Sequence, residues 1–594
     1  MLRPLRLVRI GGDEELTVNI AKMRDMQTDK EIHETNNIDN RVQAQQSARS
    51  DVPQSSLPGA VAGAEAEMIP GEMGAQSLLA SSPKSYIFNQ IYGLWFFISW
   101  FVLMTLITHK VSTEQYGVFA VILTAYNTII YIVAFGLEDA ITTYIPRVFT
   151  EHGKAAAGLL IRRLLALRIV MLIVCTIILL FSLPLLANGI ALIPIQGSVD
   201  VANGLRDQQL LARMFPIALY VLGSSVGSLL TAVCASYMRM VAVLIIGSVT
   251  QCILLGVGFV LLQLGWGIDG ILWMLAIVSL LNATSFAIWL APLVLARAKD
   301  AYRQPVMPVV RLGISAWLTN LVNGALLKQA SIILLGYFAV SLTLRGFFNL
   351  SFQLADSANA LLVAGFGGVG GSALAAAAIG RNYQRLGRSW EVLIKVETLL
   401  AAPGLVFCLF NAQNIVTVLY PKAFAPVGPL LAIFLFFNII VRVLGTTIHQ
   451  STLYVLSKAR LVVLGQWIGL VAVIGFGILL IPHYGPAGAL IADGIAKVLT
   501  GTLLLIFLWR DLPNKYPIGF TMRFLLALII AALPGIVWHP TNRILFGMSG
   551  VIFLVLCFGL LLLIKPLSAD DLDMIKGMKP GAARYLRWFA RGKR

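Results

Sequence analysis

Apolar runs separated by short polar connections occupy the chain from residue 85 to residue 564. Fourteen runs are long enough to cross a bilayer as helices, because about 20 residues at ~1.5 Å per residue span the hydrocarbon core. The eighth run exceeds one straight span, and its glycine-rich stretch 365–371 predicts a kink or an unwound turn. The predicted spans are 85–108, 117–144, 164–183, 215–235, 241–264, 271–296, 312–338, 347–378, 392–410, 427–447, 461–481, 487–509, 520–538 and 544–564.

Basic residues are concentrated in every second connection along the chain. Eighteen Lys and Arg fall in one set of alternate loops, and six fall in the other set. Loops rich in Lys and Arg stay in the cytoplasm, so this bias fixes the orientation of the helices. We therefore expect both termini in the cytoplasm, which requires an even number of spans.

Composition supports a polytopic membrane protein of the all-α class. Of the residues, 58% are hydrophobic and 12% are charged, with a mean hydropathy of +0.82. Soluble domains carry about 25% charged residues. The net charge of +17 does not predict nucleic-acid binding, because the basic residues are scattered singly. The five cysteines lie in apolar runs without a CxxC or Cys/His cluster, so we expect no disulfide, metal or cofactor.

The amino-terminal segment 1–84 differs from the rest of the chain. It is rich in Gln, Asn, Ser and Ala, with few aromatic residues and charges of both signs. Such a composition buries too little apolar surface to fold, so a disordered cytoplasmic tail is predicted. The expected organisation is this tail at 1–84, a six-helix bundle at 85–300, a second at 301–510, two more helices at 511–564 and a basic cytoplasmic tail at 565–594.

Weak internal repetition relates the two bundles. An offset of 229 places Gly117 on Gly346 and Asn127 on Asp356. A second match, at an offset of 218, pairs Trp266-Gly267 with Tyr484-Gly485. A repeat of six spans keeps its orientation in the membrane. The sequence therefore predicts two parallel halves around a central cavity, as alternating-access transporters often have.

A polar stripe on the second helix of each half marks the predicted cavity. Thr124, Asn127 and Tyr131 recur at helical spacing in the second span, and Asp356 lies in a similar stripe of the eighth. Acids facing lipid are costly, so these faces should turn inward. Two roles stay open for the acids, coupling to a proton or sodium gradient or structural hydrogen bonding. The candidates are Asp356, Glu138 and Asp139, with Glu397 a weaker one.

Basic residues inside apolar spans suggest a site for an anion. Arg442 shares a helical face with Asn438, Lys328 follows Asn320 on the seventh span, and Lys497 lies on the twelfth. Embedded bases on polar stripes can hold phosphate oxygens. The alternative is local pairing four residues apart, which Asp493 with Lys497 and Glu391 with Lys395 allow. No acid is found at such a spacing from Arg442, so we expect it to be unpaired, near mid-membrane, and the main phosphate ligand.

Several segments resemble the polysaccharide-transporter family of the multidrug/oligosaccharidyl-lipid/polysaccharide flippase superfamily. They are STEQYGVFAVI, FGLEDA, LYPKAFAPVGPLLAIF at 419–434 and LLIPHYGPAGALIADGIAKVL at 479–499. The resemblance covers about 85–564 and rests on degenerate motifs. It implies two six-helix bundles in a V shape and a flippase for a polyprenyl-diphosphate-linked oligosaccharide in the bacterial cytoplasmic membrane. Contact with polymerase or glycosyltransferase machinery is a further expectation, and catalysis is not expected.

Other functions stay open. A multidrug exporter and a lipid-linked peptidoglycan-precursor flippase belong to the same superfamily. A membrane-embedded glycosyltransferase or polymerase is disfavoured, because the predicted external loops hold few acids or bases for glycosyl chemistry. A channel is disfavoured because the two halves are dissimilar and no pore-loop pattern is present in the sequence.

The loop charges generate a prediction about topology. A cysteine that replaces Arg385, or one placed in the tail 565–594, should lie in the cytoplasm. It should react with a membrane-impermeant thiol reagent only after the membrane is opened. Labelling of either position in intact cells would contradict the orientation.

Overall fold

The computed structural model describes residues 70–191, 208–237, 239–296, 302–363, 374, 377–378, 383–538, 542–578 and 586–590. Within these ranges the chain is helical, apart from turns and one isolated bridge between Leu567 and Ala590. Most of the predicted amino-terminal tail, and the glycine run of the eighth span, lie outside the described residues. The all-helical fold class is confirmed for the described part of the chain.

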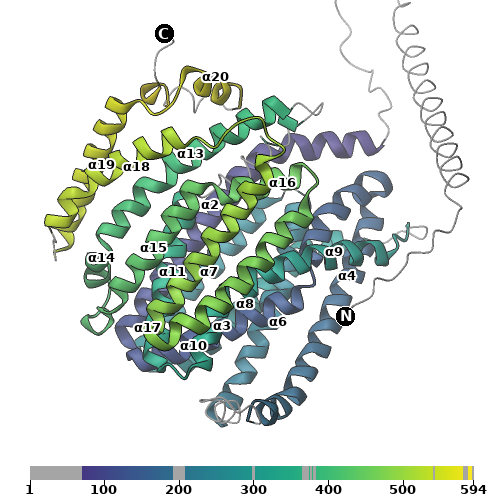
Figure 1. Cartoon of the computed structure of the whole chain (residues 1–594). Coiled ribbons are helices and arrows are strands. Elements are labelled where there is room, and N and C mark those ends of the chain that lie inside the picture. Colours follow the sequence, from purple (N-terminus) through teal and green to yellow (C-terminus); the bar gives the residue numbers. More distant parts are fainter. Residues whose placement is uncertain are drawn as a thin grey trace, which may run out of the picture. The chain divides into compact units, whose positions relative to one another are not determined.

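The first half of the membrane region begins with α2 and ends with α8 (Figure 1). Helix α3 begins at a capping box, in which Ser112 and Gln115 satisfy each other's backbone N–H groups. Its end is marked by Phe135, which adopts a left-handed conformation. The helices are α2 (Pro70–Lys110), α3 (Thr113–Ala134), α4 (Leu137–Ala191), α6 (Gln208–Ser236), α7 (Met240–Gln263) and α8 (Gly267–Val294).

Helix α4 folds back on itself at Gly153, whose φ of 80° and ψ of −178° are not helical. Glu138 and Arg168 lie at equal distances along the chain on either side of this glycine, and their side chains form an ion pair. Contact between such positions requires the two limbs to run antiparallel. The first limb therefore completes the second span, and the other limb is the third span.

The second half repeats this plan with more interruptions. A π-helical turn, η1 (Leu321–Leu326), joins α9 to α10 within the seventh span, and Gly445 bends the tenth span between α15 and α16. The helices are α9 (Val306–Asn320), α10 (Leu327–Tyr337), α11 (Leu342–Val363), α13 (Tyr383–Phe410), α14 (Ala412–Leu419), α15 (Val427–Leu444), α16 (Thr446–Val455), α17 (Ala459–Trp509), α18 (Ile518–Val537), α19 (Arg543–Ile564) and α20 (Ala569–Met578).

Helix α17 is also two spans, because it folds back at Gly485 with φ 54° and ψ −128°. A Cβ on Gly469 would lie 2.2 Å from Oγ1 of Thr500, and Gly465 faces Leu504 in the same way. Ten helices among the described residues are long and apolar enough to cross a membrane. The second limbs of α17 and α4, the α9–α10 segment and α11 lie in the other four predicted spans.

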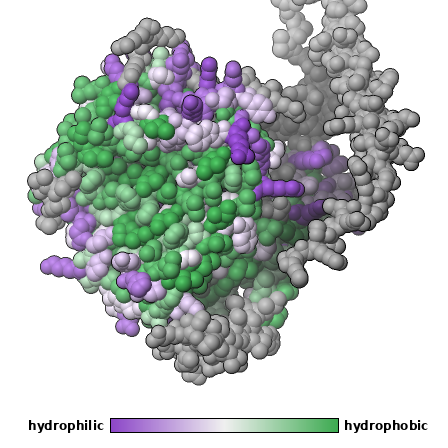
Figure 2. Space-filling view, in the orientation of Figure 1, coloured by the Kyte–Doolittle hydropathy of each residue, from purple (hydrophilic) through white to green (hydrophobic). Residues whose placement is uncertain are grey.

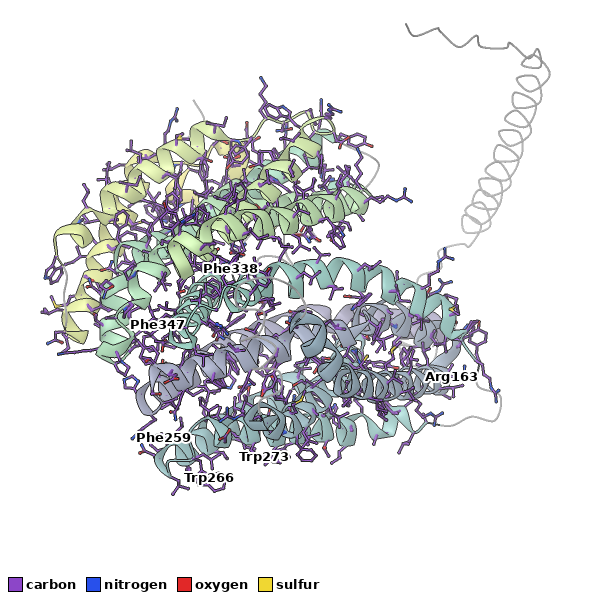
Figure 3. The ribbon with its side chains drawn as sticks, turned by 60° about the horizontal axis from the view of Figure 1, so that its bottom comes forward. Arg163, Phe259, Trp266, Trp273, Phe338 and Phe347 are labelled. Atoms are coloured by element: carbon purple, nitrogen blue, oxygen red, sulfur yellow. The ribbon has the colours of Figure 1, made fainter. Side chains whose placement is uncertain are left out.

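The surface matches a bilayer. Figure 2 shows apolar residues over a broad band of the visible face, with hydrophilic residues gathered toward its two ends. Phe259, Trp266 and Trp273 lie on or between α7 and α8, and their side chains are exposed (Figure 3). Trp is enriched where a membrane meets water, and Trp266 occupies the turn between these two helices. The chain is therefore a multi-pass membrane protein.

The two halves meet where the predicted repeat places equivalent glycines. Gly117 of α3 and Gly346 of α11 are in direct contact, since a Cβ on Gly346 would lie 3.0 Å from Cα of Gly117. A Cβ on Gly117 would lie 1.9 Å from the carbonyl oxygen of Leu342. Equivalent positions touch each other when they lie near a two-fold axis. This contact agrees with the repeat that pairs Gly117 with Gly346 in the sequence.

The glycine contact generates a stability prediction. Gly117→Ala should lower the free energy of unfolding by about 1–3 kcal/mol, because the added methyl group meets backbone that cannot rotate away. Thermal unfolding of the purified protein in detergent measures this. Gly256→Ala in α7, where a Cβ meets nothing within 4 Å, is the matched control. Equal unfolding temperatures for the two variants would contradict the close contact.

Candidate functional site

A cavity of about 260 Å³ lies between the two halves. Helices α2, α3 and α6 supply its wall from the first half, and α10 and α11 supply it from the second. Aromatic rings and uncharged polar groups dominate the lining among the described residues, with one carboxylate. The lining residues are Phe96, Phe97, Trp100, Leu123, Asn127, Tyr131, Tyr220, Gln329, Ile332, Phe348, Asn349, Phe352, Gln353, Asp356 and Ser357.

A hydrogen-bonded chain crosses the cavity wall between the halves. Trp100 Nε1 donates to Oε1 of Gln353 at 2.7 Å, and Nε2 of Gln353 donates to Oδ1 of Asn349 at 3.1 Å. Trp100 belongs to α2, while Gln353 and Asn349 lie one turn apart on α11. The indole of one half is thus held by the polar stripe of the other half.

Three predicted site residues lie in this lining. Asn127 and Tyr131, one turn apart on α3, line it from the first half, and Asp356 lines it from α11. The spacing that predicted an inward-facing stripe therefore agrees with their placement. Their roles in binding or ion coupling stay predictions.

An aromatic cluster closes the predicted external end of the cavity. The ring of Phe424 meets Tyr116 edge to face at a centroid distance of 5.7 Å, and Phe347 at 5.9 Å. Phe347, labelled in Figure 3, belongs to α11, Tyr116 belongs to α3, and Phe424 lies between α14 and α15. Burial raises the pKa of the neighbouring Tyr420 to about 12, so this phenol is neutral at physiological pH. The seal at this end of the cavity is apolar and uncharged.

A second contact between the halves lies toward the opposite end of α3. A Cβ on Gly136 would lie 2.0 Å from the carbonyl oxygen of Gly313, which belongs to α9. The rings of Phe135 and Trp317 stack with centroids 5.2 Å apart. Trp317 Nε1 also donates to the carbonyl oxygen of Tyr131 at 2.9 Å. The second span therefore touches α11 at one end and α9 at the other.

The prediction that Arg442 is unpaired is wrong. Its Nη1 lies 2.5 Å from Oε1 of Glu397, and its Nε donates to Oδ1 of Asn359 at 2.7 Å. The Glu397 side chain is only 1% exposed, and Arg442 does not line the cavity. Glu397 lies on α13, so its approach depends on helix packing that the pattern within one helix does not contain.

The other residues predicted to bind an anion are Lys497, Asn438, Lys328 and Asn320. Lys497 Nζ lies 2.7 Å from Oδ2 of Asp493, which confirms the local-pairing alternative. Its ammonium group is 4.5 Å from the ring centroid of Phe434 and 5.3 Å from that of Phe352. Asn438 is buried away from the lining. The side chains of Lys328 and Asn320 fall outside the described residues.

The two predicted acids that follow α3, Glu138 and Asp139, have different surroundings. Arg168, with a side chain 0% exposed, pairs with Glu138 and donates to the carbonyl oxygen of Val133 at 2.7 Å. Ser228 donates to the same carboxylate at 2.8 Å. These contacts agree with structural hydrogen bonding, which was the alternative to ion coupling for Glu138. Asp139 is exposed and does not line the cavity.

Apart from Tyr131, the aromatic part of the lining was not predicted from the sequence. Phe96, Phe97 and Trp100 form one turn of α2, and Tyr220 lies on α6 against Tyr126 with a ring-centroid distance of 4.6 Å. Aromatic residues occur throughout the apolar spans, and in a single sequence their pattern does not separate cavity from lipid. The polar stripes on α3 and α11 were the only signal for this cavity.

Comparisons with known proteins establish the fold. No protein-family model and no curated protein matches the sequence. A lipid II flippase MurJ structure in an inward closed conformation is similar at a TM-score of 0.54 and 13% identity, covering 82% of this chain and 98% of that chain. An inward-facing multidrug resistance MATE family transporter of the MOP superfamily reaches a TM-score of 0.53 at 16% identity, covering 72% and 93%. The chain therefore has the same fold as these two proteins.

The buried ion pair generates a testable prediction. Glu397→Gln or Arg442→Gln alone should lower the free energy of unfolding by about 3 kcal/mol, because each leaves a buried charge without its partner. The double variant should lose less than the two single losses combined. Denaturant unfolding of the purified protein measures all three. Additive losses would contradict a direct interaction.

Proposed function

We propose that this protein is a flippase that moves a polyprenyl-diphosphate-linked oligosaccharide across the cytoplasmic membrane by alternating access. The observation that supports the proposal is the chemistry of the cavity wall. Asn127, Asn349 and Gln353 offer amide donors and acceptors, and Trp100 and Phe352 add flat aromatic rings beside them. Amides complement sugar hydroxyl groups, and flat rings complement the apolar faces of sugar rings.

The lining suits the glycan better than the phosphates. No Lys or Arg is among the lining residues in the described part of the chain. Arg442 is neutralised by Glu397, and Lys497 is neutralised by Asp493. We therefore do not assign the diphosphate to either of these basic residues. The glycan would occupy the cavity while the polyprenyl tail stays in the bilayer.

The size of the cavity implies movement. About 260 Å³ is less than the roughly 300–1,000 Å³ typical of pockets that enclose drug-sized ligands. An oligosaccharide therefore requires a wider cavity. Rocking of the halves would widen it, parting the seal at Phe424 in one state and the Gly136–Gly313 contact in the other. In this proposal the two contacts act as alternate gates.

Export of an organic cation is the second candidate. The observation that favours it is Asp356, the one carboxylate in the described lining, which lies among aromatic rings. A cation gains both from a carboxylate and from ring faces. The similarity to a multidrug resistance transporter is compatible with this candidate. Asp356 is also our candidate for binding a coupling proton or sodium ion.

The flippase proposal predicts the effect of a cavity variant. Asn127→Leu keeps the approximate side-chain size but removes the amide. It should slow translocation of a fluorescent lipid-linked oligosaccharide in proteoliposomes by about five- to thirty-fold, because one or two hydrogen bonds of about 1 kcal/mol each are lost. Thr502→Val is the matched control, because the Thr502 hydroxyl donates to Val498 O of its own helix.

The two candidate functions predict different results in transport assays. Wild-type protein that moves a cationic dye but no lipid-linked oligosaccharide, with dye transport lost in Asp356→Asn, would replace the flippase proposal with cation export. An Asn127→Leu variant that translocates the oligosaccharide at the wild-type rate would contradict the assignment of this cavity to the glycan.

A further inference from the structure

A second cavity, of about 120 Å³, lies where the carboxy-terminal segment returns to the helices. Helices α18, α19 and α20 lie together in this part of the molecule (Figure 1). One wall comes from α13 and α18, and the other comes from the residues between α19 and α20 and from α20 itself. The lining residues are Lys395, Phe520, Arg523, Pro566, Leu567, Ser568 and Asp571.

A buried ion pair fixes the carboxy-terminal segment here. Lys395 Nζ lies 3.0 Å from both carboxylate oxygens of Asp571 and 2.8 Å from Oε1 of Glu391. Asp571 also accepts from the backbone N–H of Ser568 at 2.9 Å, and its own N–H donates to Oγ of Ser568 at 3.1 Å. The Lys395 ammonium group and the Asp571 carboxylate are therefore satisfied within the protein.

The Arg523 guanidinium and the Ser568 hydroxyl are two further hydrogen-bond donors on the cavity wall. Arg523 has no carboxylate within ion-pair distance among the described residues, and both Arg523 and Ser568 are exposed. The Ser568 oxygen accepts from Asp571, but its O–H group has no acceptor in the described part of the chain. Lys395 with its two acids carries one net negative charge, and Arg523 is the basic group of the described lining that has no carboxylate partner of its own.

We propose that this cavity binds the phosphate of an anionic phospholipid headgroup. A guanidinium offers a planar fork of donors that matches phosphate oxygens, and the Ser568 hydroxyl supplies another donor. A lipid fits better than free phosphate because an apolar track leaves the site. Leu526 and Ile530 follow Arg523 at helical spacing on α18, and their side chains are 60% and 44% exposed.

The predicted orientation agrees with this ligand. The connection before α18 belongs to the basic set of loops, so the cavity faces the cytoplasmic leaflet, where anionic lipids attract basic groups. A headgroup between Arg523 and Ser568 would bridge α18 to the start of α20. The lipid would then stabilise the docked carboxy-terminal segment, independently of the transported substrate.

Native mass spectrometry of the purified full-length protein tests this site. The protein is mixed with phosphatidylglycerol, phosphatidylcholine or inorganic phosphate at matched concentrations. Wild-type protein should retain phosphatidylglycerol preferentially, and Arg523→Gln should reduce the retained fraction about ten-fold, through the loss of charged hydrogen bonds. Ser568→Ala should give a smaller loss, and Arg523→Lys should restore part of the binding.

Arg510→Gln is the matched control, because Arg510 is an exposed arginine at the same predicted side but outside the cavity. It should retain the lipid as wild type does. Equal loss in Arg510→Gln, equal retention in Arg523→Gln, or equal retention of phosphatidylcholine by wild type would overturn the proposal. Competition by inorganic phosphate alone at the same concentration would assign the site to free phosphate instead.

Discussion

Charges inside this protein must be neutralised within a membrane that does not solvate them, and the structure depends on how this is done. An unpaired charge near the bilayer centre costs several kcal/mol. Arg168 and Glu138 join two spans of the first half, and Arg442 and Glu397 join two spans of the second. These pairs restrict how the helices can pack. They also leave the described wall of the central cavity neutral, polar and aromatic, apart from one carboxylate.

The repeat places buried charges at equivalent positions in the two halves. The same offset that relates Gly117 to Gly346 also relates Arg168 to Glu397. Both lie on the third span of their half, and both are almost completely buried. Their charges are opposite, so each half needs a partner of the other sign from another helix. The position of the buried charge is repeated while its sign is reversed.

The sequence predicts whatever depends on one helix and its neighbours along the chain. The fourteen spans, the stripes with Asn127 and Asp356, and the Asp493–Lys497 pair follow from periodicity and spacing. The Arg442–Glu397 pair does not, because the two residues meet only after α13 and α15 pack together. The aromatic lining is equally hidden, since a Trp in an apolar span has the same pattern whether it faces lipid or a cavity.

The hydrogen bonds of the cavity wall bear on how a glycan would bind under the proposed function. Trp100, Gln353 and Asn349 already bond to one another, so a sugar hydroxyl would replace these bonds and the gain in free energy would be small. Affinity would then come mainly from contact with rings such as that of Phe352, and the amides would contribute specificity. The bond between Trp100 and Gln353 also joins the two halves. Replacing it with bonds to the glycan would loosen one contact between them, so binding and the first step of rocking would share the same atoms.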